Sequence, residues 1–470
     1  MADRGVRRVE RPRGAIGIPV VALVLALVLS FVLWSRGNLN SLICDGDCGP
    51  ANVTAPEGLT DDSSASTART DPAPSGSLDA SKVEAAVSGA MKSAALGDHV
   101  GLVVMGSTGE VLVSRGTGTF IPASTAKLLT GFAALSEVGP QTRFTTSVVS
   151  DGDKIVLVGG GDPYLRVRKA KGSEREANAN LTTLAARTAK ALKRQGVDRV
   201  SLGFDSSLFS GPAASPGWKS SYVSGNIVTP VSALWADQGV VGGIRSRNPA
   251  ASAATIFAKL LESRGIAVAG TPDSVSSSSA STPLASVRSA TVAQIVEALV
   301  RTSDNQAAEV MLRHVAIAAD EPATFEGGAD AVTGVLAKAG IDTTGLRLFD
   351  GSGLSRNDRV SPTTLAQTVL AANANLSTST LLSSLPVSGF DGTLTDRFSK
   401  SKRAYGLVRA KTGTLTGVHS LAGYAVEATG LPVIFALMSD GTPKIDLASA
   451  EAALDRVAAA IAACSCGSTP

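Results

Sequence analysis

The chain has 470 residues, of which 44% are apolar and 18% charged. This length and composition allow two or three domains with a sizeable core and exclude a wholly disordered protein. The formal net charge of +3 equals that of residues 1–13, which hold five arginines against Asp3 and Glu10, so the rest of the chain is near neutral. Because no basic stripe with interleaved aromatic residues follows, nothing indicates a nucleic-acid-binding surface.

Residues 14–34, GAIGIPVVALVLALVLSFVLW, form an apolar run long enough to cross a bilayer as a helix. A cleaved signal peptide is the alternative, but the run is longer than the apolar core of such peptides and no A-x-A site follows closely. The preceding arginines predict a cytoplasmic tail at residues 1–13. We therefore expect a single-pass protein of the cell membrane whose remaining residues are extracytoplasmic.

The four cysteines lie near the two ends of this extracytoplasmic part, namely Cys44, Cys48, Cys464 and Cys466. An even number of cysteines in an oxidising environment predicts disulfides. Because the C-x-C spacing is poorly suited to a local bridge, we favour bonds between the two ends of the chain. A metal site is the weaker alternative, since no histidine lies near either pair.

The chain then divides into four parts by composition and periodicity. Residues 35–79 are rich in small, polar and acidic residues and predict a disordered linker. Residues 80–145 and 289–470 predict one antiparallel sheet flanked by helices, an α/β arrangement of the α+β type. Residues 146–288, with short strands and a helix, predict an inserted, mainly β accessory domain; whether it is one domain or two stays open.

Ser124 and Lys127 stand three residues apart in IPASTAKLLTGF, at the start of a predicted helix. This spacing places both side chains on one helix face, within reach of a hydrogen bond. A buried lysine with a lowered pKa can accept the proton of a serine hydroxyl and make it nucleophilic. Alone the motif is weak, because S-x-x-K recurs at Ser399 and Lys402, and a serine before a helix is also an ordinary N-cap.

Two further motifs follow in chain order. S-D-N at residues 303–305 stands between two predicted helices, and K-T-G at residues 411–413 ends a predicted strand. Each has an ordinary structural alternative, a capping turn for the first and an edge-strand lysine before a turn for the second. Together with S-x-x-K, they form the motif set of class A β-lactamases and penicillin-binding proteins. No G-x-S-x-G elbow accompanies the three histidines, which disfavours a Ser-His-Asp hydrolase.

With these motifs, the chain resembles the penicillin-binding D-alanyl-D-alanine carboxypeptidases/endopeptidases of peptidase family S13, the class C low-molecular-mass penicillin-binding proteins. The resemblance covers residues 80–463 and includes GGGDPYL (159–165), DGSGLSR (350–356) and GFDGTL (389–394). The long interval between S-x-x-K and S-D-N fits as well, because this family inserts one or two extra domains there.

The resemblance implies the penicillin-binding protein/β-lactamase-like transpeptidase fold and a serine D-Ala-D-Ala carboxypeptidase, with endopeptidase activity as an option. Such an enzyme trims peptidoglycan stem peptides through an acyl-serine intermediate, is inhibited by β-lactams, and needs neither a metal nor a cofactor. A β-lactamase-like hydrolase and a non-catalytic cell-wall binding protein are the alternatives.

The resemblance also implies roles for individual residues. The catalytic ones are the nucleophile Ser124, the base Lys127, the proton relay Ser303, and Asn305, which holds Lys127 and the substrate. Substrate binding is implied for Lys411, Thr412, Gly413 and Thr414, with the backbone N–H groups of Ser124 and Thr414 as the oxyanion hole. Asp162 is implied to recognise a free amine on the third residue of the peptide; an aspartate in a Gly-Pro turn is the equal alternative. Asp350 and Ser352 are expected to shape the site entrance, or to form only a glycine turn.

Overall fold

The structure, a computed structural model, describes residues 76–151, 154–169, 179–278, 280–442 and 447–468. The predicted cytoplasmic tail, the predicted membrane helix and most of the predicted linker lie outside these ranges. Within the ranges, no helix combines the length and hydrophobicity that a membrane span requires.

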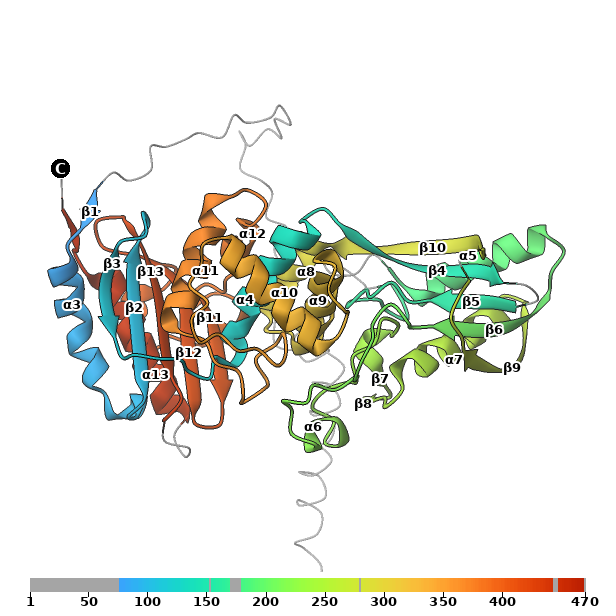
Figure 1. Ribbon diagram of the computed structural model, residues 1–470, viewed down its shortest axis with the longest axis horizontal. Helices are drawn as coiled ribbons and strands as arrows, with labels where there is room; N and C mark the ends of the chain where they lie inside the picture. The colour runs from blue at the N-terminus through green and yellow to red at the C-terminus, as the bar shows by residue number, and fades with distance from the viewer. Residues whose placement is uncertain (1–75, 152–153, 170–178, 279, 443–446, 469–470) are drawn as a thin grey trace, which may run out of the picture. The chain divides into compact units, whose positions relative to one another are not determined.

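A five-stranded antiparallel sheet joins the two ends of the described chain (Figure 1). The order β11-β12-β13-β2-β3 places the strand that carries K-T-G at one edge. This confirms the predicted antiparallel sheet built from both ends of the head. The strands are β2 (Val100–Gly106), β3 (Val111–Arg115), β11 (Val408–Leu415), β12 (Val418–Val426) and β13 (Pro432–Ser439).

Successive side chains of a strand point to opposite sides of the sheet, and in these strands both sets are apolar. Helices therefore cover both faces of the sheet and bury them. Leu102 and Val104 pack into one core with helices α3 (Ala80–Ser88) and α13 (Leu447–Ala463). Val103 and Met105 pack into a second core with the helices of the opposite face. These helices are α4 (Ala126–Ala133), α8 (Val292–Arg301), α9 (Asn305–Ala318), α10 (Phe325–Lys338), α11 (Pro362–Ala374) and α12 (Thr380–Ser383).

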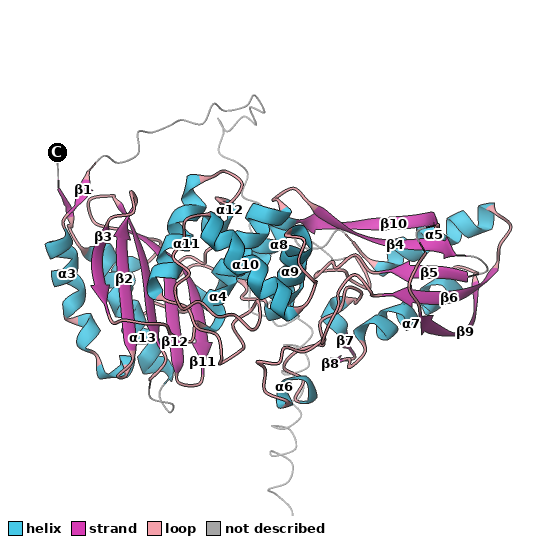
Figure 2. Cartoon of the chain, viewed as in Figure 1, coloured by secondary structure: helices cyan, strands magenta, loops and turns pink. Residues whose placement is uncertain are grey.

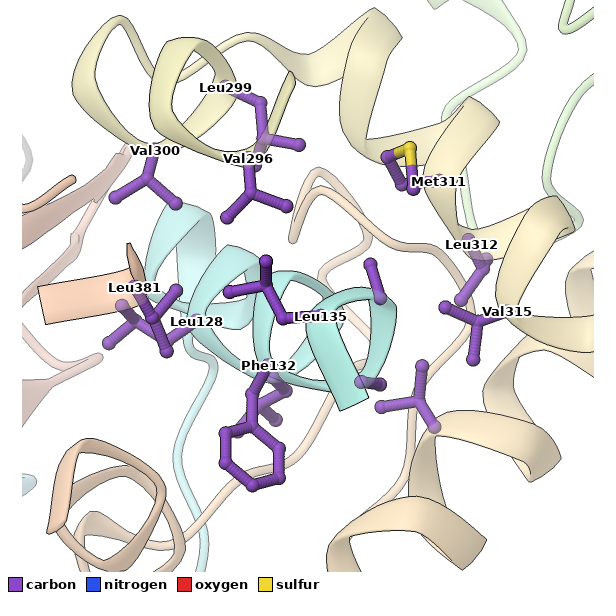
Figure 3. Packing of buried hydrophobic residues seen from close by; sticks show 14 of the residues in the cluster. Leu128, Phe132, Leu135, Val296, Leu299, Val300, Met311, Leu312, Val315 and Leu381 are labelled. Atoms are coloured by element: carbon purple, nitrogen blue, oxygen red, sulfur yellow. The ribbon is translucent and has the colours of Figure 1, made fainter. Parts of the chain in front are cut away.

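Helix α4 lies inside the second core, and all eight of its residues are buried. Figure 3 shows Leu128 and Phe132 of α4, and Leu135 just after it, among apolar side chains of α8, α9 and α12. A helix that is buried on all sides is held by contacts around its whole circumference. The position of any polar group on α4 is therefore fixed by dense packing, as is the case for Lys127.

The segment between α4 and α8 forms a second five-stranded sheet in the order β10-β4-β5-β6-β9 (Figure 2). Strands β5, β6 and β9 run parallel, and such neighbours need crossover connections. Two helices supply the crossovers and share one core with the sheet, so the insertion contains one crossover helix besides the expected strands and helix. The elements are β4 (Arg143–Asp151), β5 (Lys154–Val158), α5 (Leu181–Arg194), β6 (Arg199–Asp205), α7 (Pro249–Glu262), β9 (Ala267–Ser274) and β10 (Thr282–Thr291).

Shorter elements accompany these sheets and helices. They are a hairpin of β7 (Val240–Val241) and β8 (Ile244–Arg245), the single-turn helix α6 (Ser221–Ser224), and the pair formed by β1 (Ser77–Leu78) and β14 (Gly467–Ser468). The last pair ties the beginning of the described chain to its end.

The C-terminal cysteines differ from the expectation. Cys464 and Cys466 are bonded to each other, with their Cα atoms 5.1 Å apart. The predicted bonds between the two ends of the chain are therefore wrong for this pair. The chain leaves α13 after Ala463 and extends into β14, and this path brings residues two apart into the Cα separation that a disulfide needs. Cys44 and Cys48 lie outside the described residues.

Candidate active site

Ser124 lies in a single 3-10 turn, η3 (Ala123–Thr125), that leads directly into α4. It is half-buried, whereas the residues on both sides of it are buried. Its hydroxyl does not cap the helix, because α4 has no side-chain cap and the hydroxyl instead meets Lys127. Ala123 before it has φ +47°, a left-handed conformation that costs free energy in a residue with a Cβ atom. The N-cap interpretation of Ser124 is thereby excluded.

The amine of Lys127 lies at the centre of the site and is fully buried. Its Nζ lies 2.9 Å from Ser124 Oγ, 2.7 Å from Asn305 Oδ1 and 2.7 Å from the carbonyl oxygen of Ser352. The last two groups can only accept hydrogen bonds, whereas a serine hydroxyl can also donate. A neutral amine keeps two N–H groups for Asn305 and Ser352, and its lone pair then faces the Ser124 hydroxyl.

Burial also favours the neutral form of this lysine over the charged form. Desolvation lowers the pKa of Lys127 from 10.5 to about 8, although the negative charges of Glu309, Asp350 and Asp304 act in the opposite direction. The pKa of Lys411 is lowered as well, by its own burial and then by the charge of Lys127. Two buried lysines that disfavour each other's charge make a neutral amine available near neutral pH, which is the form that a general base requires.

The S-D-N residues form the turn between α8 and α9. Asp304 caps α9, because its carboxylate accepts the N–H of Ala307 at 3.1 Å, and Asn305 then directs its amide oxygen to Lys127. Ser303 has φ +59° and is half-buried. Its hydroxyl has no hydrogen-bond partner among the described residues, so its role as proton relay remains a prediction.

K-T-G lies close to the nucleophile because Gly413 has no side chain. A Cβ atom on Gly413 would lie 3.1 Å from Ser124 N and 2.6 Å from the carbonyl oxygen of Pro122, and it would overlap Ser420 Oγ. Only glycine therefore allows β11 to lie this close to the turn that carries Ser124. The three sequence motifs, far apart along the chain, are thus brought together around one hydroxyl.

The outer edge of β11, away from β12, is covered by residues 386–388 as far as Ala410 and then presents backbone groups beside the nucleophile. The N–H of Ala410 points away from β12 and bonds Pro386 O at 3.1 Å. Backbone direction alternates along a strand, so the N–H of Thr414, four residues later, points to the same outer edge, beyond the stretch that residues 386–388 cover. This orientation suits the second oxyanion-hole donor that the sequence predicts. The Thr414 hydroxyl faces another way, toward Glu451 Oε1 at 3.4 Å.

The other two K-T-G side chains also have partners. Lys411 is fully buried and donates to the carbonyl oxygen of Thr412 at 2.8 Å. The Thr412 hydroxyl donates to Thr393 Oγ1 at 2.9 Å. Thr393 belongs to GFDGTL, so this stretch forms the wall that adjoins β11 at the site.

Asp162 lies apart from these groups, in the insertion. It is only 4% exposed, its Oδ1 accepts the N–H of Tyr164 at 2.9 Å, and its backbone oxygen accepts from Trp235 Nε1 at 3.1 Å. Burial raises the pKa of Asp162 to about 7. These contacts match the turn interpretation, and recognition of an amine remains a prediction. The acidic side chains that line a nearby cavity of 370 Å³ beside the S-D-N turn are instead Asp237 and Asp304.

DGSGLSR occupies a different place from the one expected. Asp350 and Ser352 are fully buried, so they do not shape the entrance of the site; they lie behind Lys127. The backbone carbonyl of Ser352 is a direct partner of the catalytic amine that sequence reasoning missed. Glu309, which binds the N–H groups of this turn, was missed as well. The D-G-S-G stretch was a signal for Ser352, whereas no motif marked Glu309.

A serine paired with a buried lysine, an asparagine on the same amine and a glycine-bearing edge strand is the arrangement of the penicillin-binding protein and β-lactamase class. The model of the D-Ala-D-Ala carboxypeptidase 3 (S13) family matches residues 83–243 and 242–461. The chain therefore belongs to this peptidase family.

Relatives and solved structures agree with this assignment. The chain is 32% identical to carboxypeptidase DacB of Mycolicibacterium smegmatis over 96% of this chain and 97% of that protein. It is 35% identical to a carboxypeptidase of Mycobacterium tuberculosis over 73% of this chain and 77% of that protein. The fold is that of penicillin binding protein 4 of Haemophilus influenzae, with a TM-score of 0.64 at 22% identity over 82% of this chain and 98% of that one. A complex of that protein with a β-lactam superposes with a TM-score of 0.59.

Proposed function

We propose that the protein is a serine-type D-Ala-D-Ala carboxypeptidase that trims peptidoglycan stem peptides through an acyl-serine intermediate. One observation carries this proposal, the 2.9 Å hydrogen bond between Ser124 Oγ and the buried amine of Lys127. It is supported by the family membership of the chain and by the carboxypeptidase names of its relatives.

Acylation begins when Ser124 Oγ attacks the carbonyl carbon between the two terminal D-alanines. Lys127 takes the hydroxyl proton and becomes an ammonium, which its three hydrogen-bond partners stabilise. The N–H groups of Ser124 and Thr414 stabilise the oxyanion, a contribution of about 3 to 4 kcal/mol per donor in comparable sites. The C–N bond then breaks, and the proton reaches the amine of the departing D-alanine through Ser303. An ester on Ser124 remains.

Deacylation reverses these proton transfers. Lys127, neutral again, takes a proton from water, whose oxygen attacks the ester carbonyl. The C–O bond breaks, Ser124 regains its proton, and the shortened peptide leaves as a carboxylic acid. Before cleavage, Lys411 and the Thr412 and Thr414 hydroxyls bind the terminal carboxylate, for which the two hydroxyls exchange their contacts with Thr393 and Glu451. An endopeptidase reaction uses the same steps on a cross-linked peptide whose leaving amine belongs to a longer group.

β-Lactams acylate Ser124 in the same way and leave a slowly hydrolysed ester. A β-lactamase needs, in addition, a positioned general base for rapid deacylation, usually a carboxylate. Glu309 and Asp350, the acidic residues between S-D-N and K-T-G whose charges act most strongly on Lys127, are fully buried and bound to backbone N–H groups. They are not placed to activate water above the ester, which favours a carboxypeptidase over a β-lactamase.

We further propose that residues 14–34 anchor the enzyme in the cell membrane with residues 1–13 in the cytoplasm. The support is the apolar run and the arginines before it. The substrate lies outside the cytoplasm, which agrees with this orientation.

One assay of the full-length protein in detergent separates the candidate functions. The protein is incubated with fluorescent penicillin and, separately, with a diacyl peptide ending in D-Ala-D-Ala. Long-lived labelling together with D-alanine release is expected. Rapid turnover of penicillin would instead indicate a β-lactamase, and absence of labelling a binding protein without catalysis.

A further inference from the structure

Glu309 is a fully buried carboxylate that belongs to none of the three motifs. It lies on α9 one turn after Asn305, so both side chains project from the same face of the helix. Its Oε2 accepts the N–H of Gly351 at 2.8 Å, and its Oε1 accepts the N–H of Ser352 at 3.1 Å. One carboxylate thus binds two successive backbone N–H groups of the D-G-S-G turn.

This turn presents the Ser352 carbonyl to Lys127 Nζ at 2.7 Å. Helix α9 therefore supplies one partner of the amine directly, through Asn305, and holds a second one through Glu309. The turn is also held from α4, where the Thr130 hydroxyl donates to Gly351 O at 2.8 Å. The peptide between Gly351 and Ser352 is fixed on both sides.

We propose that Glu309 is a positioning residue for acylation: it fixes the Ser352 carbonyl, which holds one N–H of Lys127 so that the lone pair of the neutral amine faces Ser124. The reason is geometric. An amine with two fixed acceptors has one direction left for its lone pair, whereas an amine with one fixed acceptor can rotate about the Cε–Nζ bond. Loss of near-attack geometry of about 1 Å costs about a hundredfold in rate in comparable sites. The inference rests on the proposed function.

The charges around Glu309 provide an independent way to detect this role. Glu309 faces Asp350 and Asp358 on the turn, Lys127 on α4 and Arg313 on its own helix. Burial, followed by the charge of Asp350, raises the pKa of Glu309 to about 8. Lys127 additionally faces Asp304 and Lys411. Glu309 carries its negative charge only above this pKa, where the charge raises the pKa of Lys127, so neutralising Glu309 lets the base reach its full activity at a lower pH.

The substitution Glu309→Gln tests the proposal in the full-length protein. Glutamine keeps one acceptor oxygen, but its NH2 group opposes the second backbone N–H. In folded protein, the acylation rate with fluorescent penicillin rises with pH along an acidic limb and reaches a plateau at high pH. In the variant, the plateau rate should fall at least tenfold, and the acidic limb should move to lower pH. Glu326→Gln, an exposed residue in the first turn of α10, is the matched control and should change neither quantity.

A second variant separates geometry from charge. Glu309→Asp keeps the charge but is too short to span both N–H groups, so the plateau should fall while the acidic limb stays in place. If Glu309→Gln does not fold, this variant alone decides. Folded Glu309→Asp with a wild-type plateau, or folded Glu309→Gln with a wild-type acidic limb, overturns the inference. Wild-type protein that takes no label would instead refute the proposed function itself, so the two failures are distinguishable.

Discussion

The backbone nitrogen of Ser124 lies 3.1 Å from the point where a Cβ atom of Gly413 would stand. A methyl group therefore does not fit between the edge strand and the turn that carries the nucleophile. Gly413→Ala should push β11 away from the nucleophile and lower the acylation rate about a hundredfold, since displacements of about 1 Å have this effect in comparable sites. The rate of labelling by fluorescent penicillin measures this loss of acylation rate.

Gly334 on α10 is the control for that substitution, because an added Cβ atom meets nothing within 4 Å there. Gly334→Ala should leave labelling unchanged and raise stability by up to about 1 kcal/mol, the usual gain in a helix interior. A Gly413→Ala protein that labels at the wild-type rate would show that β11 has room to adapt, and the close approach would then have no catalytic meaning.

The two S-x-x-K motifs of the chain allow a matched test of the nucleophile. Ser124→Ala and Lys127→Met should each lower D-alanine release by about a thousandfold or more, because nucleophile and base act as a unit. Ser399→Ala and Lys402→Met, in the exposed second motif, should have no effect. Circular dichroism verifies that each variant is folded. Penicillin labelling that persists in Ser124→Ala would contradict the assignment of the nucleophile.

The pH dependence of acylation follows from the state of Lys127. Burial lowers its pKa to about 8, and only the neutral amine accepts the serine proton. The value of kcat/KM should therefore rise about tenfold per pH unit below that pKa and level off above it. Stopped-flow measurements of acylation between pH 6 and 10 follow this rise and the plateau above it. A rate that is flat over this range, or that falls as the pH rises through 8, would argue against lysine as the base.

The sequence predicted the catalytic pair because its geometry is local. Ser124 and Lys127 lie within one helical turn, so their spacing places both side chains on one face, and the motif set then distinguished this pair from Ser399 and Lys402. The shared sheet was also predictable, since a hairpin at one end and three apolar strands at the other bury both faces when they join one sheet. Bringing S-D-N and K-T-G to the same hydroxyl required the motif set, because their sequence separation from Ser124 carries no distance information.

Other features could not be predicted from residue types. The Ser352 group that binds Lys127 is a backbone carbonyl, which every residue possesses, so no side-chain pattern marks it. The burial of Asp162 depends on how the insertion packs around it. The bond between Cys464 and Cys466 depends on the path of the chain after α13, which spacing rules for isolated pairs do not describe.

Asp162 permits a test in which stability and substrate recognition give different answers. Its pKa is raised by burial to about 7, against 3.8 for the ordinary group. Between these values the folded chain holds a proton that the unfolded chain has released, so this residue makes stability fall as pH rises through that window. Asp162→Asn keeps an acceptor for the N–H of Tyr164 and removes the charge. Its Tm should exceed that of the wild type at pH 8 and match it at pH 4.

The control for this substitution is Asp330→Asn on α10, an exposed position where Tm should change at neither pH. Peptides with and without a free amine on the third residue supply the second readout. If Asp162 serves only the turn, Asp162→Asn leaves the KM values of both peptides unchanged while Tm rises at pH 8. A selective rise in KM for the amine-bearing peptide, with no gain in Tm, would mean that the carboxylate is ionised and binds substrate, and the burial argument would then be wrong.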